Sequence, residues 1–256
     1  MARRNKLWRF AQLQTYSNYY EAPIHGPNAG HGVIGSSGKE EDMRGRWAKD
    51  HFGNDNPITL ELACGRGEYT VALAREHADR NFMGVDIKGA RIYLGATDLK
   101  ETGHTNAAFL RTRIESIDHF FGIGEVSEIW ITFPDPFHGS ENRRLTSARF
   151  WINYARMLPE GGRIHLKTDD PDLYEYSRQQ SPLLTHFKQV ADFPDIYGEK
   201  ELPHPELIHK TYYERKNIAK SPTIHWLSWE RNAEPIPDAY TVKEKNVVVS
   251  VDVEES

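Results

Sequence analysis

Two glycines, Gly65 and Gly67, directly follow a short apolar run and open a segment with helical spacing. Glycine at such a place lets the backbone turn tightly and approach a ligand closely. Dinucleotide binding usually requires one more glycine before this pair, where the chain has Ala63. Glu61 and Glu68 would also place negative charge where a pyrophosphate has to lie, at the start of a helix. The loop is therefore unsuited to NAD.

S-adenosylmethionine reverses this argument, because it carries no phosphate and has a cationic sulfonium and an ammonium group. Acidic side chains around the loop then favour the ligand. Asp86 lies at the end of the next apolar run, where an acidic residue of nucleoside-binding sheets accepts hydrogen bonds from the ribose hydroxyls. Loop and acid together predict a site for S-adenosylmethionine. A structural turn with an unrelated surface aspartate is the alternative.

Asp135 lies between two prolines at the end of another apolar run, EIWITFPDP. The following proline disfavours helical backbone at Asp135 and keeps its carboxylate at the edge of a sheet. Such a carboxylate can accept hydrogen bonds from the exocyclic amine and ring N–H of a base. Methylation of a ring nitrogen with a free lone pair needs alignment and charge stabilisation rather than a general base. One carboxylate suits both tasks, although a rigid turn with an incidental aspartate has the same sequence.

Two further aspartates, Asp169 and Asp170, follow the run RIHLKT. Either could bind a substrate, and either could cap the helix predicted from PDLYEYSR. Cys64 lies inside the glycine loop without a His/Asp pair to activate it, which favours a small filling residue over a nucleophile. The 12 histidines show no metal-ligand spacing, so we expect no metal.

Strands alternate with helices of ten to fifteen residues from Pro57 onward. We predict strands at 58–62, 82–87, 107–112, 128–133 and 163–168. This alternation is typical of an α/β fold with a doubly wound, mostly parallel sheet, whose ligands lie at the carboxyl ends of the strands. Two later runs, 186–193 and 223–230, predict a closing antiparallel hairpin.

The chain divides into three parts by composition. Residues 1–56 are rich in Gly, Asn, Ser and His and predict a mobile arm with a short helix near 41–51. Residues 57–230 form the α/β domain, and 231–256 are an acidic tail. With 38% hydrophobic residues among 256, two small domains are the alternative to this single domain.

No stretch approaches the ~20 apolar residues of a membrane span, and the start of the chain lacks the apolar core of a signal peptide. The single cysteine fits a reducing compartment, so we expect a cytoplasmic protein. A net charge of -5 argues weakly against a protein that coats nucleic acid. Basic side chains nevertheless cluster at Arg3, Arg4, Lys6 and Arg9, and again at Arg143 and Arg144. Solvated surface charge is the simpler interpretation of each cluster alone.

A series of motifs spans residues 57–230 in a fixed order: ELACGRG, FMGVDIKGAR, FLRTRIE, EIWITFPDP, RRLTSARF, GGRIHLKTD and TYYE. On these motifs the chain resembles the bacterial tRNA (guanine-N7)-methyltransferases, class I S-adenosylmethionine enzymes that methylate guanine 46 in the variable loop of tRNA. The resemblance implies a Rossmann-like fold with a seven-stranded sheet, S-adenosylmethionine as cofactor and tRNA as substrate. We expect a monomer or homodimer.

The resemblance also implies roles for particular residues. Asp135 is the catalytic carboxylate and borders the cofactor. The implied cofactor-binding residues are Glu61, Gly65, Gly67, Asp86, Arg113 and Asp135. The implied substrate-binding residues are Asp169, Thr211, Tyr213 and Glu214. Without the resemblance, Thr211 and Glu214 would be read as a capping box at a helix start. The basic arm at residues 3–9 is a hypothetical tRNA contact.

Three positions depart from the family pattern. Ala63 replaces a loop glycine, which is tolerable if its φ is not positive. Arg113 stands where an acidic residue near the adenine is usual, and Glu115 or backbone groups could take its place. The basic residues usual after Pro-Asp-Pro are missing at 137–141, which predicts weaker tRNA binding. Two alternative functions remain. The protein could be a methyltransferase of this fold that acts on another RNA or a small molecule, or a non-catalytic relative that binds RNA.

Overall fold

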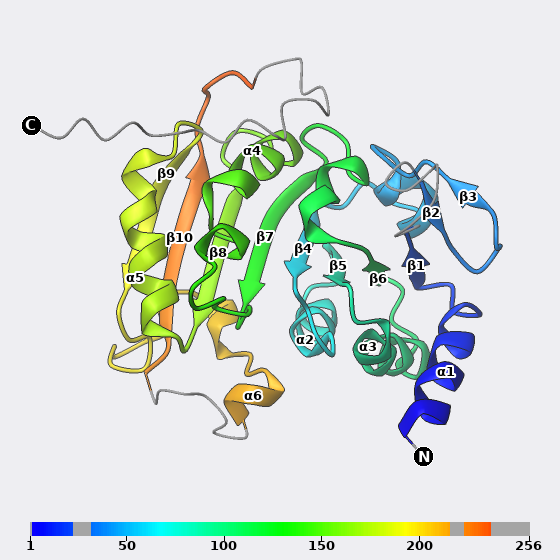
Figure 1. Cartoon of the computed structure of the whole chain (residues 1–256). Helices are drawn as coiled ribbons and strands as arrows, with labels where there is room; N and C mark the ends of the chain where they lie inside the picture. Colours follow the sequence, from blue (N-terminus) through cyan, green and yellow to red (C-terminus); the bar gives the residue numbers. More distant parts are fainter. Residues whose placement is uncertain (1, 23–31, 216–222, 237–256) are drawn as a thin grey trace, which may run out of the picture.

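The computed structural model describes residues 2–22, 32–215 and 223–236. Their strands form one sheet in the order β3-β2-β1-β6-β5-β4-β7-β8-β10-β9. The strands predicted from the sequence are β4 (Ile58–Leu62), β5 (Asn81–Asp86), β6 (Ala107–Arg111), β7 (Val126–Thr132), β8 (Arg163–Thr168), β9 (Phe187–Phe193) and β10 (His225–Arg231). Strands β4 to β8 are parallel, and β10 runs antiparallel to β8 and β9. The predicted doubly wound sheet with its antiparallel hairpin is confirmed (Figure 1).

Helices cover both faces of this sheet. They are α2 (Glu68–Glu76), α3 (Gly89–Thr102), α4 (Ala148–Met157) and α5 (Pro171–Gln180), with shorter 3-10 turns η2 (Ile114–His119), η3 (Glu141–Arg143) and η4 (Ser181–Leu183). One buried cluster joins β4 and β7 to α4 and α5, and a second joins β5 and β6 to α2 and α3. Each amphipathic helix thus buries its apolar stripe against the sheet, which places the strand ends between the two layers.

A long connection between β9 and β10 carries η5 (Pro205–Ile208) and α6 (Tyr212–Arg215). Figure 1 shows the arrowheads of β4, β5 and β7 pointing to the same edge of the sheet, with α6 at that edge. The connection therefore returns to the edge at which parallel α/β sheets bind their ligands.

The first 56 residues contain more regular structure than the sequence pattern predicts. Their described part contains α1 (Ala2–Leu13), the short strands β1 (Tyr19–Glu21), β2 (Val33–Ile34) and β3 (Glu40–Glu41), and a π-helical turn, η1 (Trp47–Phe52). β1 pairs in parallel with β6 and so extends the sheet beyond the predicted seven strands. Strands of two or three residues show no period in a sequence, so the pattern missed them. Most of the predicted tail, 237–256, lies outside the described residues.

None of the helices in the described part of the chain is long and apolar enough to cross a membrane.

Candidate functional site

The glycine loop, residues 63–67, has left-handed backbone at three residues. The φ angles are 60° at Ala63, 57° at Gly65 and 73° at Gly67. The condition under which Ala63 would be tolerated without strain is therefore not met, since a Cβ at positive φ costs about 1 kcal/mol. Gly67 caps α2 at its start. The loop therefore turns sharply, and three of its backbone N–H groups are used inside the fold: Cys64 donates to the carbonyl of Val85, Gly65 to the Asp86 carboxylate and Gly67 to the carbonyl of Cys64.

Three glycines make room for one aromatic ring. A Cβ on Gly67, Gly84 or Gly95 would overlap the ring of Phe109 in β6. A Cβ on Gly95 would also lie 2.7 Å from the carbonyl oxygen of Arg66. Because α3 carries Gly95, it can approach the loop and form one wall of the crevice. The sequence offered a signal for this, since isolated glycines inside strand and helix patterns often mark close approach.

Glu61 lies buried beneath the loop. One of its carboxylate oxygens accepts hydrogen bonds from the backbone N–H (2.9 Å) and hydroxyl (2.5 Å) of Thr70, and the other from the Thr132 hydroxyl (2.7 Å). Burial, together with the nearby Asp86 carboxylate, raises the pKa of Glu61 to about 7. Two close acids with little solvent favour a cationic ligand above them, which is the charge that a sulfonium would supply.

Asp86 organises the mouth of the same crevice. Its carboxylate accepts hydrogen bonds from the backbone N–H groups of Gly65 (2.9 Å) and Lys88 (2.7 Å). The side chain thereby fastens the glycine loop to the start of α3. Cys64, beside it, is buried, and burial raises the pKa of its thiol well above the usual value. A protonated, buried thiol is a filling group, as the sequence indicated.

Asp135 is exposed at the end of β7 in a strained turn. Its carboxylate accepts a hydrogen bond from the backbone N–H of Phe137 at 3.1 Å. Phe133 and Phe137, on either side of Pro-Asp-Pro, have φ of 46° and 45°. Positive φ in bulky residues costs of order 1–3 kcal/mol each and concentrates at functional sites. The turn holds the carboxylate outward at the edge of the sheet.

The two arginines after this turn differ in exposure. Arg144 is buried, donates to the carbonyl of Pro136 at 2.9 Å and lies over the Tyr176 ring. It therefore braces the turn from behind instead of offering charge to RNA. The Arg143 guanidinium lies over the ring of Phe137 at 4.3 Å. His138 contacts the Asp170 carboxylate at 3.1 Å, so the turn also touches the start of α5.

The question of which aspartate caps α5 has a clear answer. Asp170 accepts a hydrogen bond from the backbone N–H of Leu173 at 2.9 Å and is the N-cap. Asp169 does not cap the helix and is half-buried beside it. The capping role is thus taken by its neighbour, which leaves the substrate role open for Asp169.

The Thr211–Glu214 segment is anchored from below by a lysine that the sequence analysis missed. Lys167 in β8 is fully buried, and its ammonium donates to the carbonyls of Leu207 (3.1 Å) and His209 (2.9 Å) and to the Glu214 carboxylate (3.0 Å). Burial lowers the pKa of Lys167, and the charge of Glu214 opposes this.

The ends of this segment are also fixed. The hydroxyl of Thr211 accepts from the backbone N–H of Glu214 at 3.5 Å, as a helix cap does. Tyr197 donates to the second oxygen of Glu214. Tyr213 lies in α6, but its side chain is outside the described part of the structure. Both termini of the TYYE motif are therefore held by buried polar contacts.

Arg113 is exposed between β6 and η2. Glu115, the suggested substitute for an acid near the adenine, lies 3.9 Å from Arg149 and is also exposed. Neither residue has a contact that ties it to the glycine loop among the described contacts, so the cofactor role of Arg113 stays a prediction.

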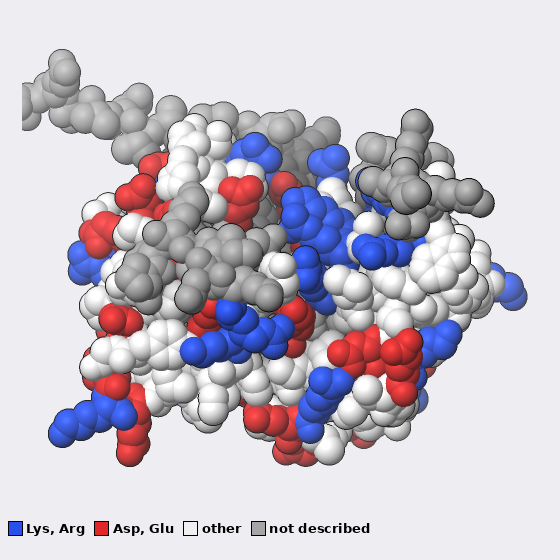
Figure 2. All heavy atoms as spheres, turned by 90° about the horizontal axis from the view of Figure 1, so that it is seen from below, with Lys and Arg blue, Asp and Glu red and all other residues white. Residues whose placement is uncertain are grey.

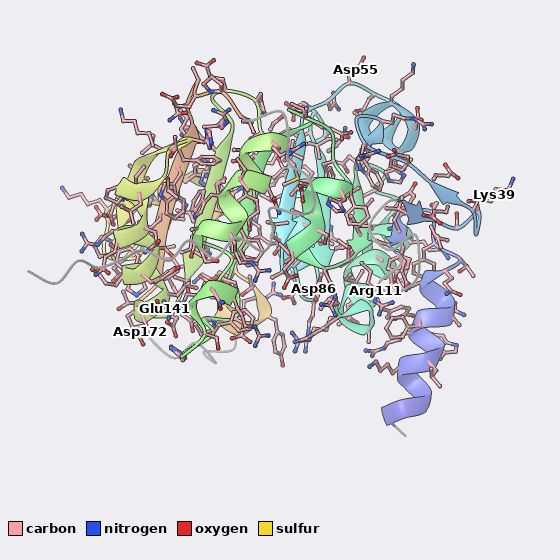
Figure 3. All side chains as sticks on the ribbon, turned by 45° about the horizontal axis from the view of Figure 1, so that its top comes forward. Lys39, Asp55, Asp86, Arg111, Glu141 and Asp172 are labelled. Atoms are coloured by element: carbon pink, nitrogen blue, oxygen red, sulfur yellow. The ribbon has the colours of Figure 1, made fainter. Side chains whose placement is uncertain are left out.

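Several acidic and basic side chains lie at the edge of the sheet where β4, β5 and β7 end (Figure 1 and Figure 3). Figure 3 shows Asp86, Glu141 and Asp172 on the side of the sheet opposite to Asp55, which precedes β4. Figure 2 views this edge directly, and Lys and Arg side chains lie across it between acidic ones. A shallow hollow beside the loop is lined by Arg9, Gly65, Arg66, Ala90, Arg91 and Leu94. The acidic net charge of the chain thus conceals a local group of arginines near the glycine loop.

Two side-chain groups in the described part of the chain have ligand atoms close enough for a metal ion: Glu128, His165 and His204, and His138, Asp170 and Asp172. In the first group the Glu128 carboxylate already has a cationic partner, because Arg80 pairs with it. In the second, Asp170 caps α5. The expectation of a metal-free protein stays a prediction.

The sequence of the chain is similar to a described protein family and to proteins of known name. Residues 55–227 match the sequence model of a family described as "Putative methyltransferase". The chain is 46% identical to the tRNA (guanine-N(7)-)-methyltransferase of Porphyromonas gingivalis, over 77% of this chain and 85% of that protein. It is 38% identical to the protein of the same name from Bacteroides fragilis, over 97% of this chain and 92% of that protein.

The chain belongs to the tRNA (guanine-N(7)-)-methyltransferase family. This confirms the resemblance drawn from the motifs. The fold is also similar to that of the 16S rRNA methyltransferase KamB, with a TM-score of 0.58 at 11% identity over 76% of this chain and 96% of KamB. At that identity the similarity shows the class I methyltransferase fold alone. The region matched by the family model contains the carboxylates described above and excludes α1.

Proposed function

We propose that this protein transfers a methyl group from S-adenosylmethionine to N7 of guanine 46 in the variable loop of tRNA. The observation that carries the proposal is the placement of Asp135 and Asp169 at the ends of the adjacent strands β7 and β8, next to the glycine loop that ends β4. The names of the relatives support the substrate and the reaction.

The residues around the loop fit S-adenosylmethionine. Gly65 and Gly67 provide a close backbone approach, and Asp86 provides a carboxylate at the ribose position. Glu61 provides a buried carboxyl beneath the loop, whose ionised form a bound sulfonium would favour. When bound, the cofactor would supply an electrophilic methyl group. We assign Arg113 a contact at the adenine end on the basis of sequence alone.

The chain's own residues would align the acceptor base. The carboxylate of Asp135 would accept from the N1–H and exocyclic amine of guanine, with Asp169 and the Thr211–Glu214 segment on the opposite side. The N7 lone pair forms the new C–N bond while sulfur retains the electrons of the broken C–S bond, so no proton is transferred. Guanine gains positive charge in this step, and a nearby carboxylate stabilises it.

We further propose that α1 contacts tRNA through its basic residues and that the protein acts in the cytoplasm as a monomer or homodimer. The N-terminal helix lies beside α3 and places Arg9 at the hollow next to the loop. Arginine near the mouth of the crevice would neutralise tRNA phosphates.

The direct test incubates the protein with labelled S-adenosylmethionine and unmodified tRNA, then maps alkali-labile N7-methylguanosine. Label in the variable loop is expected. Label elsewhere in tRNA, or on another RNA alone, would defeat the substrate assignment.

Asp135→Ala tests the catalytic carboxylate in the same assay. We expect loss of turnover by at least a hundredfold, with the dissociation constant for S-adenosylmethionine changed less than about threefold. Asp172→Asn is the matched control, since this aspartate is exposed at the same edge and should retain activity. Full activity of Asp135→Ala would refute its role.

A further inference from the structure

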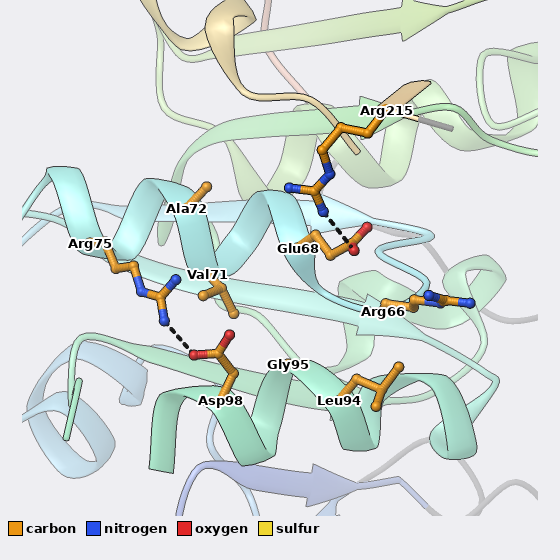
Figure 4. A pocket seen from close by; sticks show the side chains of 9 residues that line it. All are labelled: Arg66, Glu68, Val71, Ala72, Arg75, Leu94, Gly95, Asp98 and Arg215. Atoms are coloured by element: carbon orange, nitrogen blue, oxygen red, sulfur yellow. Dashed lines mark hydrogen bonds and ion pairs between the residues drawn. The ribbon is translucent and has the colours of Figure 1, made fainter. Parts of the chain in front are cut away.

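The first residue of α2 contacts the segment that carries the TYYE motif. One oxygen of the Glu68 carboxylate accepts from the backbone N–H of Tyr212 at 2.6 Å, and the other pairs with the Arg215 guanidinium at 2.9 Å. Figure 4 shows Arg215 reaching down from α6 to Glu68. Glu68 directly follows Gly67 and therefore adjoins the glycine loop at the start of the helix.

A second contact joins the same two segments. The guanidinium of Arg66, inside the loop, lies over the ring of Tyr212 at 3.8 Å, which is cation–π geometry. The two positions on either side of Gly67 thus both engage Tyr212, one through the backbone and one through the ring. Acidic residues in the first turn usually serve their own helix, so the use of this carboxylate by a segment more than 140 positions away is unusual.

The segment needs such contacts to hold its orientation. α6 has four residues, which is too short to be stable as an isolated helix. Lys167 fastens its Glu214 end to β8, and Glu68 and Arg66 fasten its Tyr212 side to the loop. Without the second fastening, the segment could pivot about Lys167.

We propose that Glu68 is a positioning residue that holds the Thr211–Glu214 segment at the guanine site, with Arg66 assisting it. The inference rests on the proposed function, because it assigns the segment to substrate binding. In this proposal the glycine loop supports both ligands. It binds S-adenosylmethionine directly and orients the Thr211–Glu214 segment, which recognises the guanine.

The two interactions of Glu68 can be removed in steps. Glu68→Gln keeps an oxygen that accepts from Tyr212 but loses the charge that pairs with Arg215. Glu68→Ala loses both. Because the ion pair is partly solvated, we expect the KM for tRNA to rise about threefold in Glu68→Gln. We expect the KM for tRNA to rise about tenfold or more in Glu68→Ala, since this variant also loses a hydrogen bond to a charged acceptor, which is stronger than one between neutral groups. The dissociation constant for S-adenosylmethionine should change less than twofold.

The groove in Figure 4 offers a matched control. Arg75 and Asp98 form an ion pair between α2 and α3 in the same groove, without contact to α6. Asp98→Asn should leave both kinetic constants for tRNA unchanged. Arg215→Gln should match Glu68→Gln, and the double variant should be no worse than either, because both remove one interaction.

Three results would overturn the proposal. One is an unchanged KM for tRNA in Glu68→Ala. Another is a KM for tRNA that is raised in Arg215→Gln but unchanged in Glu68→Gln, because Arg215 would then contact the RNA directly. The third is unchanged hydrogen exchange of the 211–215 amides in Glu68→Ala, where we expect at least tenfold faster exchange. The exchange measurement needs no RNA, so it separates failure of this proposal from failure of the proposed function.

Discussion

The role of a residue in this protein can be predicted from the sequence where it follows from the local pattern, and cannot be predicted where it depends on contacts with distant segments. The positions of Asp86 and Asp135 at the ends of apolar runs, which meet at one sheet edge, predict them as site residues. The site roles of Glu61 and Asp169 come from the family resemblance, since the sequence alone leaves Asp169 open between a substrate contact and a helix cap. The roles of Lys167 and Arg144 could not be predicted, because lysine and arginine are usually exposed and the residue type alone does not show that a side chain is buried. Only packing shows that each is enclosed by acceptors from other segments.

The buried carboxyl of Glu61 predicts a pH dependence of stability. Its pKa in the folded protein is about 7, above the ordinary value of 4.5, so the folded state holds a proton that the unfolded chain loses between these values. The free energy of unfolding of the cofactor-free protein should therefore fall as pH rises from 4.5 to 7, by about 3 kcal/mol from this group. Glu61→Gln should abolish that fall in urea unfolding measured at pH 5 and 8.

Glu101→Gln serves as the control for this measurement, because Glu101 is exposed on α3. It should keep the wild-type pH profile. A Glu61→Gln protein with the wild-type profile would show that Glu61 stays ionised in the fold.

At the scale of elements, the sheet and its helices were predictable while the connections were not. Alternating apolar runs and helical spacing located β4 to β8 because each element is long enough to show its period. The connection between β9 and β10 has several prolines and no period, yet it carries α6. Its path is set by distant buried groups, above all Lys167, so no local rule could place it.

The ring of Phe109 in β6 packs against the loop, so adding a methyl group to the loop should be costly. Gly67→Ala combines a φ of 73° with overlap of the Phe109 ring, so we expect a loss of about 2–4 kcal/mol in unfolding free energy. S-adenosylmethionine binding should weaken by at least tenfold.

Gly103→Ala is the matched comparison, since its φ is also 73° but a Cβ there would meet nothing within 4 Å. It should cost about 1 kcal/mol and leave the binding constant unchanged. Equal losses in the two variants would rule out steric overlap as the cause.

The anchor of the β9–β10 connection gives a second prediction at this scale. Lys167→Met leaves the buried Glu214 carboxylate without its cation, so we expect about 3–5 kcal/mol of destabilisation. Adding Glu214→Gln should restore part of that stability, measured by urea unfolding, while tRNA methylation stays low. A double variant as unstable as the single one would show that the carbonyl contacts dominate.

At the scale of the whole molecule, charge is distributed unevenly. A net charge of -5 coexists with arginines at the mouth of the crevice and a basic helix beside it. Deleting α1 would not test its charge alone, because Leu13 is buried and Arg9 and Trp8 contact α3. Substitutions that keep the helix are therefore required.

Arg3→Gln, Arg4→Gln and Lys6→Gln combined should raise the KM for tRNA. The slope of log KM against log salt should fall by about 1 for each tRNA phosphate that these side chains no longer neutralise. Lys39→Gln, Lys49→Gln and Lys188→Gln combined remove the same charge from exposed positions elsewhere and should preserve the slope. Equal effects of the two triple variants would show that only total charge matters.

The parallel pairing of β1 with β6 also has a consequence for synthesis of the chain. Glu21 and Arg111, which pair across these strands, are 90 positions apart. At roughly 5–20 residues per second, about 5–20 s of translation separate the emergence of β1 from that of the strand on which it docks. β1 therefore cannot join the central strands until β6 has been made, whereas α1 packs on α3, which is made before β6.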